Sequence, residues 1–279
     1  MAYVTLKDIF TTCNGKKAVG AFNIHNLEFI KGVIAGAEKE NKPVIMMINE
    51  GVLKYGEIEI LGGAAVAAAK KSKVDVAVMV DHGGDIEFLK QSIDFGIDIM
   101  YDGSHLSFEE NIKNTKMLCD YAHSKNRSIE GEIGVLGLSE DGDEEHEQKM
   151  TTPEEAVDFV AKTGVDVLAI SVGNVHGFYE GEANINVDRI KEISTAVKGL
   201  PVVMHGGSDI PYETIKNSIL FGIKKFNIAT DLKYAYAKKM CDLMHQDPMP
   251  MQPLQLFPVV AEAVAVVVSE KIKMFELEV

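Results

Sequence analysis

Residues 74–84 have the sequence VDVAVMVDHGG, an almost unbroken apolar run that ends in aspartate, histidine and two glycines. The run VDVLAISV at residues 165–172 has the same character. Apolar residues without alternation are typical of a strand in a parallel sheet, because helices cover one face of the sheet and a packed interior covers the other. The sequence therefore predicts a parallel β-sheet that is buried on both faces.

Eight such runs occur along the chain, and each is followed by a segment whose apolar residues have helical spacing. The predicted strands are Ala18–Asn23, Pro43–Asn49, Val74–Asp81, Asp98–Asp102, Ser128–Gly134, Val165–Ser171, Pro201–His205 and Lys225–Ala229. Two predicted helices are Asn26–Glu40, with Asn26 as N-cap, and Pro153–Thr163, with proline in the first turn. Eight βα units in 279 residues predict an α/β protein that forms a closed (β/α)8 TIM barrel rather than an open sheet.

No linker and no shift in composition divides the chain, so residues 1–279 are predicted to form a single TIM-barrel domain with extra C-terminal helices. One segment departs from the βα pattern. Residues Leu138–Met150 carry six acidic side chains among thirteen and show no apolar periodicity. This segment is either a mobile loop over the mouth of the barrel or a solvated acidic turn without a function, and the sequence leaves both interpretations open.

The composition is that of an ordinary globular protein, with 46% hydrophobic and 25% charged residues. Lysine and arginine number 28 against 42 acidic residues, a formal charge of −14, so the surface is expected to repel nucleic acid and anionic membranes and to favour a small-molecule ligand. Three scattered cysteines without a CxxC pattern indicate a reducing compartment. No leader is apparent, and no stretch approaches the ~18 apolar residues of a membrane span, so the protein is predicted to be cytoplasmic.

Polar residues gather where the predicted strands end, which is where a TIM barrel forms its active site. Three of them, His82, His176 and His205, end three different strands. In a closed barrel their side chains are expected to converge, which suits a catalytic zinc with three protein ligands and one open position. Asp81, beside His82, is placed either to exchange a proton with a substrate hydroxyl or to serve structurally, as a helix N-cap or as a turn residue at the strand end.

The ends of the last two strands are rich in small residues. Gly206, Gly207 and Ser208 follow the seventh predicted strand, and residues 227–230 end the eighth. TIM barrels commonly hold a phosphate at this place, on backbone N–H groups and hydroxyls. The pair of glycines alone is weaker support, because it is also typical of a tight turn.

The sequence resembles the class II, zinc-dependent ketose-bisphosphate aldolases, the group that includes fructose- and tagatose-bisphosphate aldolases. The resemblance covers some 230 residues in order. It rests on the blocks VGAFNIHNLE (19–28), VDHGGDIE (80–87), DGSHLSFEENI (102–112), EGEIG (130–134), TTPEEAVDFVAKTGVDVLAISVGNVHGFY (151–179), HGGSDIP (205–211) and FNIATDLKYA (226–235).

The resemblance implies a zinc-dependent aldolase of carbohydrate metabolism, of the kind used in glycolysis. Such an enzyme cleaves or forms a ketose (bis)phosphate through a metal-stabilised enediolate, with dihydroxyacetone phosphate and an aldehyde as the products of cleavage. Zinc acts there as a Lewis acid, and no lysine Schiff base is needed. Members of the group also use a monovalent cation, Na⁺ or K⁺, near the phosphate loops, and they are usually homodimers or homotetramers.

The resemblance also implies roles for individual residues. The histidines His82, His176 and His205 would hold the zinc, and Asp81 would be the acid and base at the C4 hydroxyl. The remaining implied positions are Asp102 and Glu132 for the displaced metal, Glu140 for the C3 proton, and Gly177, Gly206, Gly207, Ser208, Asn227, Ala229 and Thr230 for the phosphate of dihydroxyacetone phosphate.

Several positions depart from the family pattern. Glu180 stands where a lysine near the phosphate is usual, and the other departures are Met47 and Asn49 near the substrate carbonyl and Leu138 and Ser139 at the start of the acidic loop. The chain has only two arginines, Arg127 and Arg189, and neither occupies the family's position for the second phosphate. Because arginine is the usual clamp for a phosphate, the triose phosphate half is expected to bind as in the family, whereas the aldehyde half is expected either not to derive from fructose or to be held by different contacts, for which Lys233, Lys238 and Lys239 are candidates.

Two further functions remain open at this point. The first is an aldolase of the same kind that acts on a differently substituted sugar. The second is a non-catalytic barrel that serves as a subunit beside an active partner, an interpretation that the altered positions favour and the intact histidines oppose. The exact ketose, its stereochemistry and the role of the Met- and Pro-rich segment 248–258 do not follow from the sequence.

Overall fold

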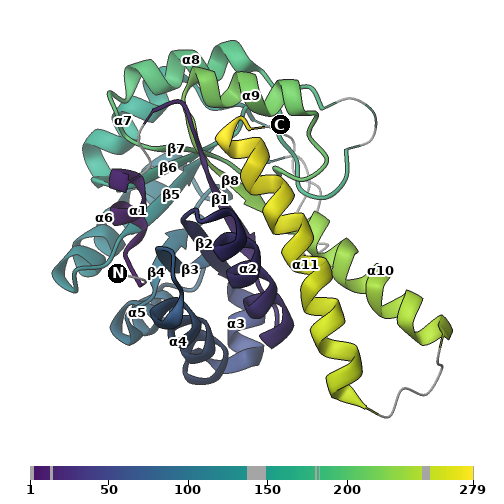
Figure 1. Ribbon diagram of the computed structural model, residues 1–279. Coiled ribbons are helices and arrows are strands. Elements are labelled where there is room, and N and C mark those ends of the chain that lie inside the picture. The colour runs from purple at the N-terminus through teal and green to yellow at the C-terminus, as the bar shows by residue number, and fades with distance from the viewer. Residues whose placement is uncertain are drawn as a thin grey trace.

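The structure is a computed structural model that describes residues 3–12, 15–136, 149–179, 181, 183–246 and 252–278. Within these residues eight parallel strands close into a barrel in the order β1 to β8 (Figure 1). The strands are β1 (Val19–Asn23), β2 (Val44–Asn49), β3 (Val76–Gly83), β4 (Asp98–Tyr101), β5 (Ile129–Ile133), β6 (Val167–Ile170), β7 (Val202–Met204) and β8 (Ile223–Ile228). The prediction of a TIM barrel is confirmed, and no predicted strand end is more than two residues from the observed end.

Helices ring the barrel in Figure 1, and two further helices follow the last strand. They are α1 (Leu6–Thr12), α2 (Leu27–Glu40), α3 (Glu50–Gly56), the π-helix η1 (Glu57–Gly62), α4 (Gly63–Lys71), α5 (Ile86–Phe95), α6 (Phe108–Ser124), α7 (Pro153–Thr163), α8 (Val187–Ala196), α9 (Tyr212–Phe221), α10 (Thr230–Gln246) and α11 (Pro253–Glu276). The last two are the extra C-terminal helices that the sequence predicts. The single-domain organisation stays a prediction.

The helix starts follow from local hydrogen bonding. Asn26 is the N-cap of α2, as predicted, and its side chain accepts from the backbone N–H groups of Glu28 and Phe29. In α7 the predicted proline lies in the first turn, and Thr152 and Glu155 form a capping box around it. These caps fix where each helix leaves the preceding loop.

The continuous apolar runs are explained by two separate apolar layers. In β3, Val76, Val78 and Val80 pack between the barrel and the surrounding helices, whereas Ala77 and Met79 fill the barrel interior. Both faces of the strand are therefore buried, and alternation of polar and apolar residues is absent. The first helix, α1, adds Leu6 and Ile9 to the interior layer near the start of the strands.

Helix α11 packs directly against α2 through two glycines of α2. A Cβ atom added at Gly32 would lie 2.7 Å from Cβ of Val264, and one added at Gly36 would lie 2.7 Å from Cβ of Val268. Real Cβ atoms do not approach so closely, so only glycine allows this helix contact. Gly32 and Gly36, one helical turn apart on α2, thus allow the C-terminal helix α11 to pack closely against the barrel's helical layer.

Replacing Gly36 with valine is expected to lower the free energy of unfolding by about 1–3 kcal/mol, because added methyl groups must displace Val268 on α11. Thermal and urea denaturation would measure the effect. Lys31→Val, on the exposed face of the same helix, is the matched control and should change stability far less. Equal stability of the two variants would show that α2 and α11 do not pack as described.

Among the described residues, one helix is long and apolar enough to cross a membrane by length and composition alone. It is α11, with a mean hydropathy of 1.5 over its most apolar window. The sequence-based prediction that no stretch is apolar enough to span a membrane was therefore wrong by this test of helix length and hydropathy. Core helices of soluble proteins pass the same test, and α11 packs on α2 through buried Val264 and Val268.

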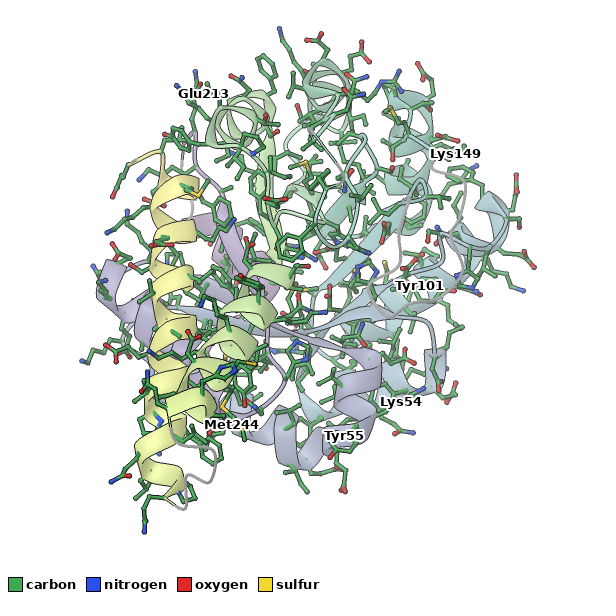
Figure 2. All side chains as sticks on the ribbon, turned by 90° about the vertical axis from the view of Figure 1, so that its right-hand side faces the viewer. Lys54, Tyr55, Tyr101, Lys149, Glu213 and Met244 are labelled. Atoms are coloured by element: carbon green, nitrogen blue, oxygen red, sulfur yellow. The ribbon has the colours of Figure 1, made fainter. Side chains whose placement is uncertain are left out.

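Figure 1 shows α10 and α11 side by side, extending beyond the barrel. This pair carries several large apolar side chains on its surface, including Leu254 and Phe257 of α11 and Met244 of α10. Met244 is labelled in Figure 2, as is Tyr55 of α3, which is also highly exposed. These apolar side chains of α10 and α11 are thus left exposed by the other residues that the structure describes.

Candidate metal centre

The position of His82 depends on an irregularity at the end of β3. Its backbone is left-handed, with a φ of 48°, and the register between β3 and β4 shifts between Val80 and Gly83. A bulge of this kind redirects a side chain, and left-handed backbone at a non-glycine residue is typical of a functional site. The local distortion explains why the His82 ring departs from regular strand geometry and lies beside the other two histidines.

The three predicted histidines come together. Ligand atoms of His82, His176 and His205 all lie within 4.8 Å of one another. The ring centroid of His82 is 4.9 Å from that of His176 and 4.7 Å from that of His205. His82 lies near the end of β3, His176 in the loop after β6, and His205 directly after β7, so the closed barrel is what brings residues far apart in sequence into one cluster.

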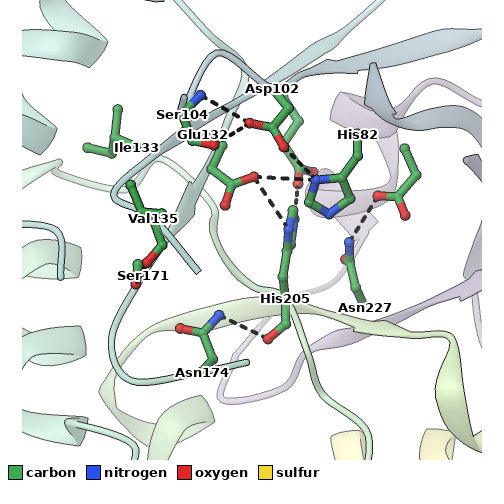
Figure 3. Close-up of polar contacts among 12 residues, drawn as sticks. His82, Asp102, Ser104, Glu132, Ile133, Val135, Ser171, Asn174, His205 and Asn227 are labelled. Carbon is green, nitrogen blue, oxygen red and sulfur yellow. Dashed lines mark hydrogen bonds and ion pairs between the residues drawn. The ribbon is translucent and has the colours of Figure 1, made fainter. Parts of the chain in front are cut away.

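A second group of ligand atoms shares His82. His82, Asp102 and Glu132 also lie within 4.8 Å of one another. Asp102 Oδ2 is 2.8 Å from Nδ1 of His82, and its Oδ1 accepts hydrogen bonds from the backbone and hydroxyl of Ser104. Figure 3 shows Glu132 between His82 and His205, with Oε2 at 3.7 Å from Nδ1 of each ring.

The cluster contains buried polar atoms that make no hydrogen bond. They are Nδ1 of His176, Nδ1 of His205 and Oε2 of Glu132. A buried polar group without a partner normally costs about 1–3 kcal/mol, so native proteins rarely leave several together. Two imidazole nitrogens and a carboxylate oxygen are ordinary ligands of zinc. The residues present therefore fit a divalent metal ion.

The pKa values of the cluster reflect burial and mutual charge. Burial lowers the pKa of His176 well below its usual value, and the charge of His82 adds to this effect. Burial raises the pKa of Glu132 well above its usual value, and the nearby charge of Asp102 raises it further. A cation among these groups would reverse the second effect and leave neutral imidazole as a ligand.

His82 behaves differently from the other two histidines. Burial opposes its charged form, but the negative charges of Asp81 and Asp102 outweigh burial and raise its pKa well above the usual value. Its Nδ1 is taken by the hydrogen bond with Asp102. The other ring nitrogen, Nε2, is therefore the atom that His82 can offer to a metal.

Asp81 is buried beside the histidines and is held by two amides. Its Oδ2 accepts from Nδ2 of Asn23 at 2.8 Å, and its Oδ1 accepts from Nδ2 of Asn227 at 3.2 Å. Burial raises its pKa, but the attraction of His82 and Lys225 and the hydrogen bond from Asn23 outweigh burial, so its pKa is lowered. The alternative role as helix cap is wrong, because Asp85 caps α5. Asp81 is thus an ionised carboxylate fixed at the cluster.

The predicted phosphate residues lie in loops that contact one another. Gly206 has a φ of 62°, and a Cβ atom there would lie 1.9 Å from the carbonyl oxygen of Val175. Gly207 donates its N–H to the carbonyl of Asn227 at 2.9 Å. Ser208 accepts from the backbone N–H of Asp231 in the first turn of α10. These contacts join the β7 loop to the β6 loop and to the start of α10.

The remaining predicted phosphate residues follow the same strands. Gly177 has a φ of 88° in the loop after β6, Ala229 is buried directly after β8, and Thr230 begins α10. Four other positions singled out in the sequence lie outside the described residues, namely Leu138, Ser139, Glu140 and Glu180. Their proposed roles stay predictions.

Glu130 and Lys225 also lie at the cluster, although neither was predicted from the sequence as a site residue. Glu130 Oε1 is 3.0 Å from Nε2 of His205, and Glu130 Oε2 accepts from Nζ of Lys225 at 2.8 Å. Burial opposes ionisation of Glu130, but Lys225 and His205 lower its pKa to about 2. Strand periodicity could have found both residues, because Glu130 shares a strand face with Glu132, and Lys225 shares one with Asn227.

The whole chain is similar to known proteins. The family described as "Fructose-bisphosphate aldolase class-II" matches residues 4–278. A fructose-bisphosphate aldolase from Staphylococcus aureus is 36% identical over 283 residues, which cover 99% of this chain and 98% of that protein. A sulfofructosephosphate aldolase from Alkalicoccus urumqiensis is 36% identical and covers 100% of this chain and 98% of its own length. The crystal structure of the YdjI aldolase from Escherichia coli superposes with a TM-score of 0.86 at 33% identity and covers 98% and 97% of the two chains.

Proposed function

The chain belongs to the class II fructose-bisphosphate aldolase family and is a carbon–carbon lyase, and we propose that it is a zinc-dependent enzyme that splits a ketose phosphate into dihydroxyacetone phosphate and an aldehyde. One observation carries the proposal beyond family membership. Three histidines from three strands converge, and two of them present buried Nδ1 atoms without a hydrogen-bond partner. Such a group suits a catalytic metal.

His82, His176 and His205 would hold the zinc, and Asp102 and Glu132 are the carboxylates that would receive it when it is displaced. Bound zinc supplies a Lewis acid that stabilises the negative charge left on the triose half when the C3–C4 bond breaks. The proposal needs no Schiff base, and the fully buried Lys225 is paired with Glu130.

Asp81 would move the proton at the C4 hydroxyl. In cleavage, its carboxylate accepts the hydroxyl proton while the C3–C4 electron pair goes to the triose half, leaving an enediolate and an aldehyde. In synthesis the same group returns the proton. The amides of Asn23 and Asn227 support this role, because they hold both carboxylate oxygens in place.

Two further parts of the substrate site are proposed from the resemblance. Glu140 would exchange the C3 proton of the enediolate. The triose phosphate would be held by the small residues of the β6 and β7 loops and the start of α10, with a monovalent cation, Na⁺ or K⁺, nearby. The residues of this phosphate site are Gly177, Gly206, Gly207, Ser208, Asn227, Ala229 and Thr230.

The aldehyde half of the substrate is proposed to lack a phosphate clamped by arginine. Both arginines are engaged away from the cluster: Arg127 donates to the carbonyl of Gly96, and Arg189 donates to the carbonyl of Thr151 and pairs with Glu192. No arginine or lysine occurs among the residues outside the described ranges.

A substrate screen tests this part of the proposal. We expect a ketose 1-phosphate with an uncharged or differently charged far end to be cleaved with a higher kcat/KM than fructose 1,6-bisphosphate. The comparison should include sulfofructose 1-phosphate, because a full-length relative is named for that substrate class. Highest kcat/KM with fructose 1,6-bisphosphate would contradict this assignment of the aldehyde half, but not the aldolase reaction.

The proposed function as a whole is tested by metal content and cleavage activity measured on one preparation. About one zinc per chain and loss of carbon–carbon cleavage on chelation are expected, with recovery when zinc is restored. A protein without metal and without activity would favour the non-catalytic barrel instead. We further propose that the enzyme acts in the cytoplasm. We also propose that it forms a homodimer or homotetramer, and the exposed apolar side chains of α10 and α11 support this second proposal.

A further inference from the structure

A buried ion pair inside the barrel contacts one of the three histidines. Glu130 lies on β5, Lys225 on β8, and His205 directly after β7. Glu130 and Lys225 are 0% exposed, and His205 is 1% exposed. Nζ of Lys225 is 2.8 Å from Oε2 of Glu130, and Nε2 of His205 is 3.0 Å from Oε1. Burying two charges costs free energy of desolvation, so packing alone does not explain an ion pair in the interior of the barrel.

The hydrogen-bonding capacity of the three groups fixes their arrangement. A lysine ammonium can only donate, and an ionised carboxylate can only accept. Nζ of Lys225 occupies Oε2 of Glu130, so Oε1 is the acceptor that faces Nε2 of His205, and this contact places the ring proton on Nε2. The other nitrogen, Nδ1, then carries a lone pair, and this atom is buried without a hydrogen bond, 3.7 Å from Oε2 of Glu132.

The backbone of His205 is held as well. Nδ2 of Asn174 donates to the His205 carbonyl at 3.0 Å, as Figure 3 shows. With the backbone fixed by Asn174 and the ring fixed by Glu130, His205 has both its position and its tautomer determined before any ligand arrives. Residues that hydrogen-bond to a metal ligand raise the affinity of a site for its metal by fixing the ligand's orientation in this way.

From this arrangement we infer that Glu130 and Lys225 are positioning residues, which hold His205 with Nδ1 directed into the proposed metal centre. Lys225 has no contact with the metal ligands except through Glu130 in this scheme. Its ammonium holds Oε2 of Glu130 at 2.8 Å and so leaves Oε1 turned toward His205. The inference rests on the proposed function, because it assigns a purpose to the pair only if His205 is a metal ligand.

Two double variants separate positioning from packing. Both remove the buried charges, so neither leaves an unpaired ion in the barrel. Glu130→Gln with Lys225→Met keeps an oxygen that can accept from Nε2–H of His205, whereas Glu130→Leu with Lys225→Met keeps none. Zinc affinity, measured by competition with a chromophoric chelator, is expected to be near that of the parent protein in the first variant and about 10- to 100-fold weaker in the second.

Lys224→Met is the matched control for the lysine substitution, because Lys224 is the adjacent residue of β8 and its Nζ instead contacts the carbonyl of Gly15 at the surface. It should leave zinc affinity unchanged. Equal zinc affinity in the two double variants would overturn the inference, since a purely structural role does not distinguish glutamine from leucine by hydrogen bonding.

A second measurement needs neither metal nor substitution. The ¹H–¹⁵N spectrum of the metal-free protein should show His205 protonated on Nε2, and protonation on Nδ1 would overturn the inference even if a variant fails to fold. If the parent protein binds no zinc at all, the proposed metal centre fails, whereas the tautomer still reports whether Glu130 orients the ring. The two failures are therefore distinguishable.

Discussion

Asp81→Ala is expected to lower kcat for carbon–carbon cleavage by about a hundredfold to ten-thousandfold while zinc remains bound. The carboxylate is buried, ionised and held by the amides of Asn23 and Asn227, so no other described acidic group is fixed in the same way at this position. In the proposed reaction, its removal would leave the C4 hydroxyl proton without an acceptor. The rate of cleavage and the zinc content should be measured on the same samples.

Asp85→Ala is the control for the loss of a neighbouring carboxylate. Asp85 caps α5 and pairs with Lys54, so its loss should reduce stability by about 1 kcal/mol and leave cleavage nearly unchanged. Asp81→Asn provides a variant of similar size in case alanine disturbs the core. Turnover near that of the parent protein in either Asp81 variant would remove Asp81 from the proton transfer.

His176→Ala is expected to weaken zinc binding by more than about a hundredfold and to reduce cleavage in proportion to the zinc lost. Its buried Nδ1 has no hydrogen-bond partner, so no hydrogen bond competes with metal binding at that atom. Loss of a metal ligand should weaken zinc binding more than loss of the Glu130 hydrogen bond that orients His205. Chelator competition and a cleavage assay at rising zinc concentration would measure both quantities.

His105→Ala is the matched histidine control. His105 follows Asp102 and Ser104 in the same loop, but its side chain is exposed and is not part of the histidine cluster. This variant should retain full zinc affinity. If His105→Ala and His176→Ala bind zinc equally well, the ligand set proposed for the metal centre is wrong.

The strand ends explain how much of the site could be predicted. His82, His176 and His205 each follow an unbroken apolar run, and a closed parallel barrel brings the ends of such runs to one rim. Knowledge of that topology was enough to predict that the three residues meet. The apolar runs themselves reflect the two buried layers on either side of each strand.

Other features depend on contacts that a linear sequence does not show. The left-handed backbone of His82 accompanies a register shift between β3 and β4, and nothing in the local sequence reports that shift. The hydrogen bonds from Asn23 and Asn227 to Asp81 join three strands. Such interactions become visible only when the barrel is assembled.

Charged residues inside the barrel were the main omission. Glu130 and Lys225 occur in strands that were recognised, but a charged residue in a strand is usually interpreted as facing solvent. The period of two would have placed them on the same interior faces as Glu132 and Asn227. A buried charge with its partner on another strand can be inferred from sequence only after strand pairing is known.

Helix α11 shows that a sequence property can also suggest the wrong environment. Helix α11 has the length and composition of a membrane span, yet it packs on glycines of α2 through buried valines. Its remaining apolar surface lies on the extension formed with α10. Composition alone therefore does not distinguish a membrane helix from one that packs on a barrel.

The most direct test of the metal centre is anomalous X-ray diffraction at the zinc absorption edge, from crystals of the protein purified with zinc. The account predicts one peak among the rings of His82, His176 and His205, with nitrogen atoms about 2.0–2.1 Å from it. A zinc peak elsewhere, or one of these rings turned away from a zinc held by the other two, would contradict it.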